Sequence, residues 1–166
     1  MDGGTLVVGL GNPIMGDDGI GLALLERLCA RWEGSPGVRF VDGGTWGMML
    51  LPLIEDADRL LLLDAIAVAR PPGTAVVLER TDLPRYFGLK LSPHQIDLRE
   101  VLALAELRGT LPPDVVAIGV RPKVVEMSTE LSDAVAAGLD AAVSLAAERL
   151  TAWGHEAPVS EEPSAA

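Results

Sequence analysis

Short apolar runs alternate with longer amphipathic segments along the whole chain. The runs are rich in valine, leucine and isoleucine and end at glycine, proline or aspartate, which is typical of strands buried in a sheet. The predicted strands cover residues 5–10, 38–42, 59–66, 74–79 and 114–120. Between them apolar residues recur at helical spacing. The first predicted helix begins at Asp17 or Asp18 and ends before a break at residues 34–37. Three further helices are predicted over residues 46–57, 94–109 and 128–153.

Alternating strands and helices predict an α/β protein. We expect a three-layer α/β/α sandwich around a mainly parallel twisted sheet of about five strands. Residues 1–153 form one domain in this interpretation. The polar, proline-bearing segment 154–166 is expected to be a disordered C-terminal tail.

The composition narrows the possible partners. The 166 residues include 24 acidic and 13 basic side chains, a formal charge of −11, which argues against nucleic acid or an anionic membrane as partner. The charge suits a cation or a basic peptide. The longest apolar run is interrupted by Asp64 and is too short to span a bilayer, and no signal peptide is apparent. We expect a cytoplasmic protein in which the single cysteine, Cys29, is a buried structural thiol.

A glycine-rich turn, "GLGNPIMGDDGIG", follows the first strand and suggests a nucleotide-binding loop. Gly9 and Gly11 match the dinucleotide fingerprint, and Asp42 stands where a ribose-binding acid is expected. The third glycine position is Ile14, however, and two aspartates occupy the start of the predicted helix, where they would repel a phosphate. A nucleotide site is therefore the less favoured interpretation. A simpler one makes Asp17 a helix N-cap and Asp18 a first-turn charge without chemistry.

Further polar residues converge on the same edge of the predicted sheet, because ligands bind at the carboxyl ends of parallel strands. Asp64 follows four leucines and should face the loop that holds Asp18, and His94 begins a later helix. Two carboxylates and an imidazole suit nickel, manganese, iron or zinc, with positions left open for substrate or water. Taken alone, a histidine at a helix start such as His94 is more often a helix cap or a surface residue than a ligand.

The first residues of the predicted helix over 46–57 give only a weak indication of function. Met48 and Met49 could form a soft metal patch or a peptide-binding surface, but packing in the core, where methionine fills gaps, is the favoured prediction. Trp46 fits either packing or docking of a partner.

Three blocks together resemble the maturation endopeptidases of nickel–iron hydrogenases. The blocks are "GLGNPIMGDDGIG", "DGGTWGMMLLPLIEDADRLLLLDAI" and "SPHQIDLREVLALAELRG", and the resemblance covers about residues 5–150 in the family's order. The segment "GVRPKVVEMSTELSDAV" is also similar to a family stretch but departs from it between Pro122 and Leu131.

The resemblance implies an activity and a site. The family removes a C-terminal extension from the hydrogenase large-subunit precursor after nickel has been inserted. Asp18, Asp64 and His94 match the family's metal-contacting residues, with aspartate at position 18 where glutamate is frequent, and Asp17 matches the acid before it. The block from Asp42 through Gly43 and Gly44 to Thr45 matches the family's substrate-recognition signature.

We therefore expect a monomeric endopeptidase whose partner is the large-subunit precursor. Nickel carried by that substrate would bind Asp18, Asp64 and His94, and other divalent metals would also fit the site. A nearby acid, Asp17, Asp42 or one of the ligands, would activate water as the general base. Two alternatives remain: a non-catalytic nickel-binding maturation chaperone that uses the same three residues, and a nucleotide-binding protein.

Overall fold

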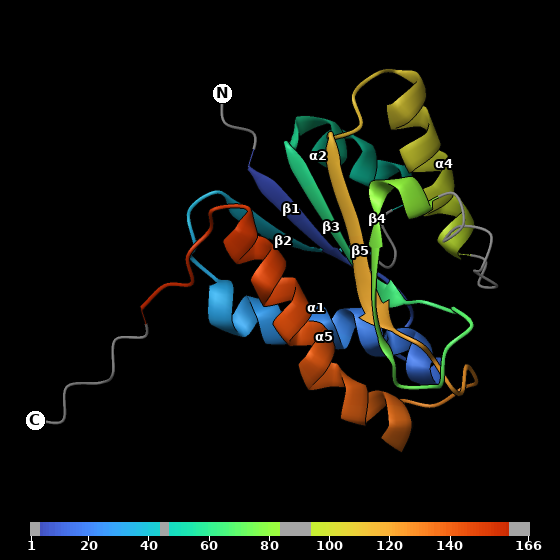
Figure 1. Cartoon of the computed structure of the whole chain (residues 1–166). Coiled ribbons are helices and arrows are strands. Elements are labelled where there is room, and N and C mark those ends of the chain that lie inside the picture. The colour runs from blue at the N-terminus through green and yellow to red at the C-terminus, as the bar shows by residue number, and fades with distance from the viewer. Residues whose placement is uncertain (1–3, 44–46, 84–93, 160–166) are drawn as a thin grey trace, which may run out of the picture.

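A five-stranded sheet forms the centre of the computed structural model, which describes residues 4–43, 47–83 and 94–159 (Figure 1). The strands lie in the order β2-β1-β3-β5-β4, and β4 alone runs antiparallel to its neighbour. Their bounds are β1 Thr5–Gly9, β2 Val38–Asp42, β3 Arg59–Ala65, β4 Ala75–Glu79 and β5 Asp114–Val120. Each predicted strand is present, and the three-layer, mainly parallel sheet is confirmed.

The central strand β3 explains why so long an apolar run belongs to a sheet. Alternate side chains point to opposite faces of a strand. Leu61 and Leu63 accordingly join one apolar core, whereas Leu60 and Leu62 join the other. All four leucines are fully buried, which requires helices on both faces of the sheet.

Two helices cover the first face. The chain leaves β1 through a glycine-rich loop and the 3-10 helix η1 (Gly16–Gly19), then forms α1 (Ile20–Trp32). Helix α5 (Asp133–Ala152) packs beside α1 on the same face, as Figure 1 shows. The apolar positions of α1 that the helical spacing predicts lie in this core: Ile20, Leu24 and Leu28 are fully buried.

The second face is covered by η2 (Gly47–Leu50), α2 (Leu51–Asp56) and α4 (His94–Leu107), with η3 (Arg80–Asp82) after β4. Pro52 lies in the first turn of α2, the position where a helix tolerates proline. The prediction that Met48 and Met49 pack in the core is wrong, since their side chains are 50% and 69% exposed. Across the described ranges, no helix has the length and apolarity needed to cross a membrane.

The described part of the C-terminal segment, which was expected to be disordered, forms a hydrogen-bonded turn and contacts the domain. Gly154 has φ +91° and ends α5 in a Schellman motif, in which the amides of Gly154 and His155 donate to the carbonyls of Thr151 and Leu150. This turn brings the chain back against the amino ends of the strands. The polar composition of the segment concealed the motif, although a glycine just past a helix is its usual signal.

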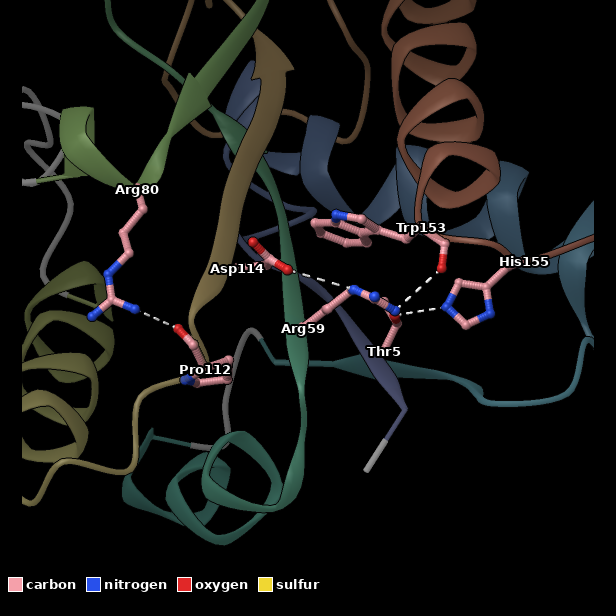
Figure 2. Close-up of polar contacts among 7 residues, drawn as sticks. All are labelled: Thr5, Arg59, Arg80, Pro112, Asp114, Trp153 and His155. Carbon is pink, nitrogen blue, oxygen red and sulfur yellow. Dashed lines mark hydrogen bonds and ion pairs between the residues drawn. The ribbon is translucent and has the colours of Figure 1, made fainter. Parts of the chain in front are cut away.

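Contacts beyond the turn hold residues 155 and 156 in place. Thr5 Oγ1 and His155 Nε2 form a hydrogen bond of 2.7 Å, and Ser35 Oγ donates to the carbonyl of Glu156 at 2.7 Å. Arg59 donates to the carbonyl of Trp153 at 3.1 Å, so that His155, Arg59 and Thr5 gather at the amino edge of the sheet (Figure 2). The ordered domain therefore extends past residue 153.

Candidate functional site

Three aspartates lie at the opposite, carboxyl edge of the sheet. The parallel register pairs Gly9 with Asp42 on one side and with Leu63 on the other, so Asp64 lies one residue beyond the end of β1. Asp18 belongs to η1, which follows the loop after β1. The predicted neighbourhood of the first and third strands is confirmed, and it brings the segments that carry Asp18 and Asp64 to one edge.

Glycines allow the backbone segments at this edge to approach each other closely. Gly11 has φ +110°, and a Cβ atom there would lie 1.9 Å from the carbonyl oxygen of Asp18. A Cβ atom on Gly21, in the first turn of α1, would lie 2.2 Å from the Leu10 oxygen and 2.4 Å from the Leu63 oxygen. The glycine-rich turn thus packs the start of the helix closely against the strand ends.

Asp18 is a buried carboxylate held by its own loop. Its side chain is 3% exposed, and Oδ2 accepts a hydrogen bond of 2.9 Å from the backbone amide of Asn12. The Asn12 side chain in turn accepts from the amide of Ile14 at 3.1 Å, which stabilises the turn. Asp18 is therefore fixed in orientation by the glycine-rich loop, as a ligand or catalytic acid requires.

Asp17 anchors two loops to each other. It is completely buried, and its carboxylate accepts four hydrogen bonds of 2.7–2.8 Å: three from the backbone amides of Lys123, Val124 and Ser132, and one from the Ser132 hydroxyl. The Asp17 amide donates to the Val124 carbonyl, and Met15 forms a bridge with Ser128. This carboxylate joins η1 to the loop between β5 and α5.

The titration of Asp17 follows from these bonds. Burial by itself raises its pKa, but the hydrogen bonds from Val124, Ser132 and Lys123 favour the charged form and lower the pKa below its ordinary value. A carboxylate so stabilised is a weak base. The interpretation of Asp17 as an N-cap is also incorrect, because its side chain accepts from a distant loop and the N-cap position of η1 is Met15.

Ser132 was recognised from sequence only as part of a helix start. It is the N-cap of α5, and its hydroxyl accepts from the amide of Val135 while it donates to Asp17. The helix begins at Asp133 and not at residue 128, because the preceding segment runs beside the glycine-rich loop. Serine is a common N-cap residue, but the bond from Ser132 to Asp17 is long-range and leaves no local signal in the sequence.

Asp64 is completely buried at the end of a core strand. Its Oδ1 accepts from the amide of Ala65 at 2.8 Å, and its place in the alternation of β3 puts it on the face that α2 and α4 cover. A Cβ atom on Gly119 of β5 would lie 1.7 Å from the Asp64 carbonyl oxygen, so glycine is required opposite it. A carboxylate at such depth needs partners that favour its charge.

Of the remaining predicted site residues, the structure describes Asp42 and Gly43 fully but not the others. Asp42 ends β2 and is exposed, and Gly43 is buried with its amide donating to the Gly9 carbonyl. His94 begins α4, but the placement of its side chain lies outside the described part, as do Gly44 and Thr45 altogether. Among the described side chains no three histidine, cysteine or carboxylate groups form a metal cluster. The ligand set of Asp18, Asp64 and His94 stays a prediction.

Comparisons with known proteins identify the family of this chain. A family model described as hydrogenase maturation protease matches residues 22–149. The hydrogenase expression/formation protein HupD of Rhodobacter capsulatus is 38% identical over 154 residues, which cover 92% of this chain and 73% of the relative. The hydrogenase 2 maturation protease of Escherichia coli is 35% identical over 153 residues, 92% of this chain and 93% of the relative.

Solved structures give the same result. The hydrogenase maturating endopeptidase HybD from E. coli matches with a TM-score of 0.88 and 34% identity, over 96% of this chain and 99% of that one. The [NiFe] hydrogenase maturation protease HybD from Thermococcus kodakarensis matches with a TM-score of 0.69 and 27% identity, over 88% and 98%. The chain belongs to the hydrogenase maturation protease family and is a peptidase.

Proposed function

We propose that the chain removes a C-terminal extension from the nickel-loaded large-subunit precursor of a nickel–iron hydrogenase. The observation that carries this proposal is the pair of buried carboxylates, Asp18 and Asp64, which a parallel β1–β3 pair brings to one edge in a chain of this family. All the proposed ligands come from one chain, so a monomer suffices. We expect the reaction to take place in the cytoplasm.

In this proposal nickel arrives as part of the substrate. Asp18 and Asp64 supply oxygen ligands and His94 supplies a nitrogen ligand, a set that suits divalent nickel. Burial keeps water away from the carboxylates and strengthens their attraction for a cation. A precursor without nickel would bring no cation to these two carboxylates, and it would bind less well.

The hydrolytic step needs a base that can take a proton. As a water oxygen attacks the scissile carbonyl carbon, the base accepts a proton from the water, and the departing amine nitrogen gains a proton as the C–N bond breaks. Asp42 is the best-placed candidate base, because it is exposed at the end of β2. Asp17 is assigned a structural role, since four donors occupy its carboxylate.

Intact mass spectrometry of a nickel-loaded precursor, incubated with purified protein, tests the activity. The wild type should release one C-terminal peptide, and Asp18→Asn, Asp64→Asn and His94→Ala should each lose at least about 100-fold in rate, the usual order for removal of a catalytic group. Glu148→Gln, on the exposed side of α5, is the matched control and should cleave normally. Nickel binding without any cleavage by the wild type would favour the nickel-binding chaperone instead.

A further inference from the structure

Among the described strands, β2 is an edge strand with one side that pairs with no other strand. It is the first strand in the sheet order and pairs only with β1 in the described residues. Thr5 donates to the Gly37 carbonyl, and Gly43 donates to the Gly9 carbonyl, so the odd-numbered residues of this segment face β1. Main-chain groups alternate in direction along a strand, and the N–H and C=O of Phe40 therefore point away from the sheet. Such an edge accepts an additional strand.

A groove of about 550 Å³ lies beside this edge, between β2 and α1. Leu22, Leu25 and Phe40 give it apolar walls, Cys29 lies in its wall, and the carboxylates of Glu26 and Asp42 border it. No lysine or arginine is among its described lining residues. The chemistry fits a peptide in extended conformation that carries an apolar side chain for the walls and a cationic side chain for the two acids.

The groove is continuous with the candidate site, because Asp42 belongs to both. With Asp42 as the proposed base, the scissile bond lies beside Asp42, and the residues that follow the bond begin there. Those residues can continue along β2 only from Asp42 towards Val38, which is opposite to the direction of β2 itself.

We propose that the C-terminal extension of the precursor binds as an added antiparallel strand on β2, with alternate side chains in the groove beside α1. The inference rests on the proposed function and names the part of the substrate that this surface holds. Backbone pairing with Phe40 sets the register of the extension, and the groove contributes side-chain selectivity.

Cys29 provides a native probe of the groove, since it is the only cysteine in the chain and is partly exposed, which corrects the expectation that it is buried. The probe ligand is a synthetic peptide with the sequence of the precursor's extension. We expect saturating peptide to slow alkylation of Cys29 by iodoacetamide at least about fivefold, because a seated strand covers the thiol. A scrambled peptide should leave the rate unchanged. An unchanged rate with the true peptide would overturn the proposal.

The hydrogen-bonding pattern is tested by an N-methyl scan of the same peptide. Methylation at every second residue removes an amide that faces β2 and should weaken binding about tenfold, whereas methylation between those positions should leave binding within about twofold. The protein is unchanged in this test, so misfolding does not affect it. A flat scan, or loss at consecutive positions, would exclude an added strand.

A charge-reversal pair tests the groove in the whole reaction. Glu26→Lys places a cation beside the groove and should lower kcat/KM for the nickel-loaded precursor about tenfold, while Glu148→Lys makes the same charge change on α5 and should not. Asp64→Asn should stop cleavage while the extension peptide still protects Cys29. Normal cleavage by Glu26→Lys would refute only the role of the groove in binding the extension. Absence of cleavage by the wild type would refute the proposed function.

Discussion

Replacing Asp17 by asparagine tests whether this residue is an anchor. The carboxylate accepts four hydrogen bonds, three at Oδ2 and one at Oδ1. Asparagine keeps one oxygen, and its amide nitrogen then faces the donor that the other oxygen accepted from. Bonds to a charged group contribute about 1.5–3 kcal/mol each, and neutral ones about half as much. One bond lost and three weakened by half correspond to a loss of about 4–7 kcal/mol in the free energy of unfolding.

Urea denaturation followed by circular dichroism measures this loss. Asp140→Asn is the control, because it removes one oxygen from an exposed ion pair with Arg27 and should change stability by less than about 1 kcal/mol. If Asp17→Asn lowers the free energy of unfolding by less than about 1 kcal/mol, Asp17 is not an anchor.

The pH dependence gives a second test of the same residue. The folded pKa of Asp17 is lowered relative to the unfolded chain, so its contribution to stability is fully present above the unfolded pKa and is lost as pH falls through the folded pKa. The gap in stability between wild type and Asp17→Asn should therefore be constant near neutral pH and narrow as the pH drops below about 4. A gap that widens in acid would contradict the lowered pKa.

Two further predictions concern other positions. Gly11→Ala should destabilise the protein by at least about 2 kcal/mol more than Gly34→Ala in thermal or urea unfolding. Both glycines have positive φ, but only at Gly11 would the added Cβ contact backbone, namely the carbonyl oxygen of Asp18. Equal destabilisation by the two variants would contradict this close approach. Burial, together with the charge of Arg59, lowers the pKa of His155, so its contribution is present above the unfolded pKa near 6.5 and is lost as pH falls through the folded pKa. His155→Gln should accordingly flatten the stability profile from pH 7.5 to 5 in urea unfolding, and an unchanged slope would count against this assignment.

The sheet and its helices were predictable because their signals are local. The run that contains Leu60 to Leu63 is apolar on both faces, and this alone requires a covered central strand. Parallel topology then places Asp42 and Asp64 at one edge without further information. The antiparallel direction of β4 was not predicted, although the connection over residues 66–74 contains no helix and is shorter than the crossover that a parallel strand requires.

The error at Asp17 has its physical cause in long-range contacts, whereas the error at Met48 and Met49 has a local one. Asp17 resembles an N-cap in its local sequence, but its partners lie more than a hundred residues away at Lys123, Val124 and Ser132. Met48 and Met49 are apolar, yet the short 3-10 turn that holds them leaves them exposed.

The central claim is that Asp18 and Asp64 act on a precursor that carries nickel. The most direct measurement is the initial cleavage rate of nickel-loaded and metal-free precursor by the wild type and by Asp64→Asn, followed by intact mass. The account predicts rapid cleavage only for the wild type with nickel-loaded precursor. Equal cleavage of both precursors by the wild type, or normal cleavage by Asp64→Asn, would contradict it.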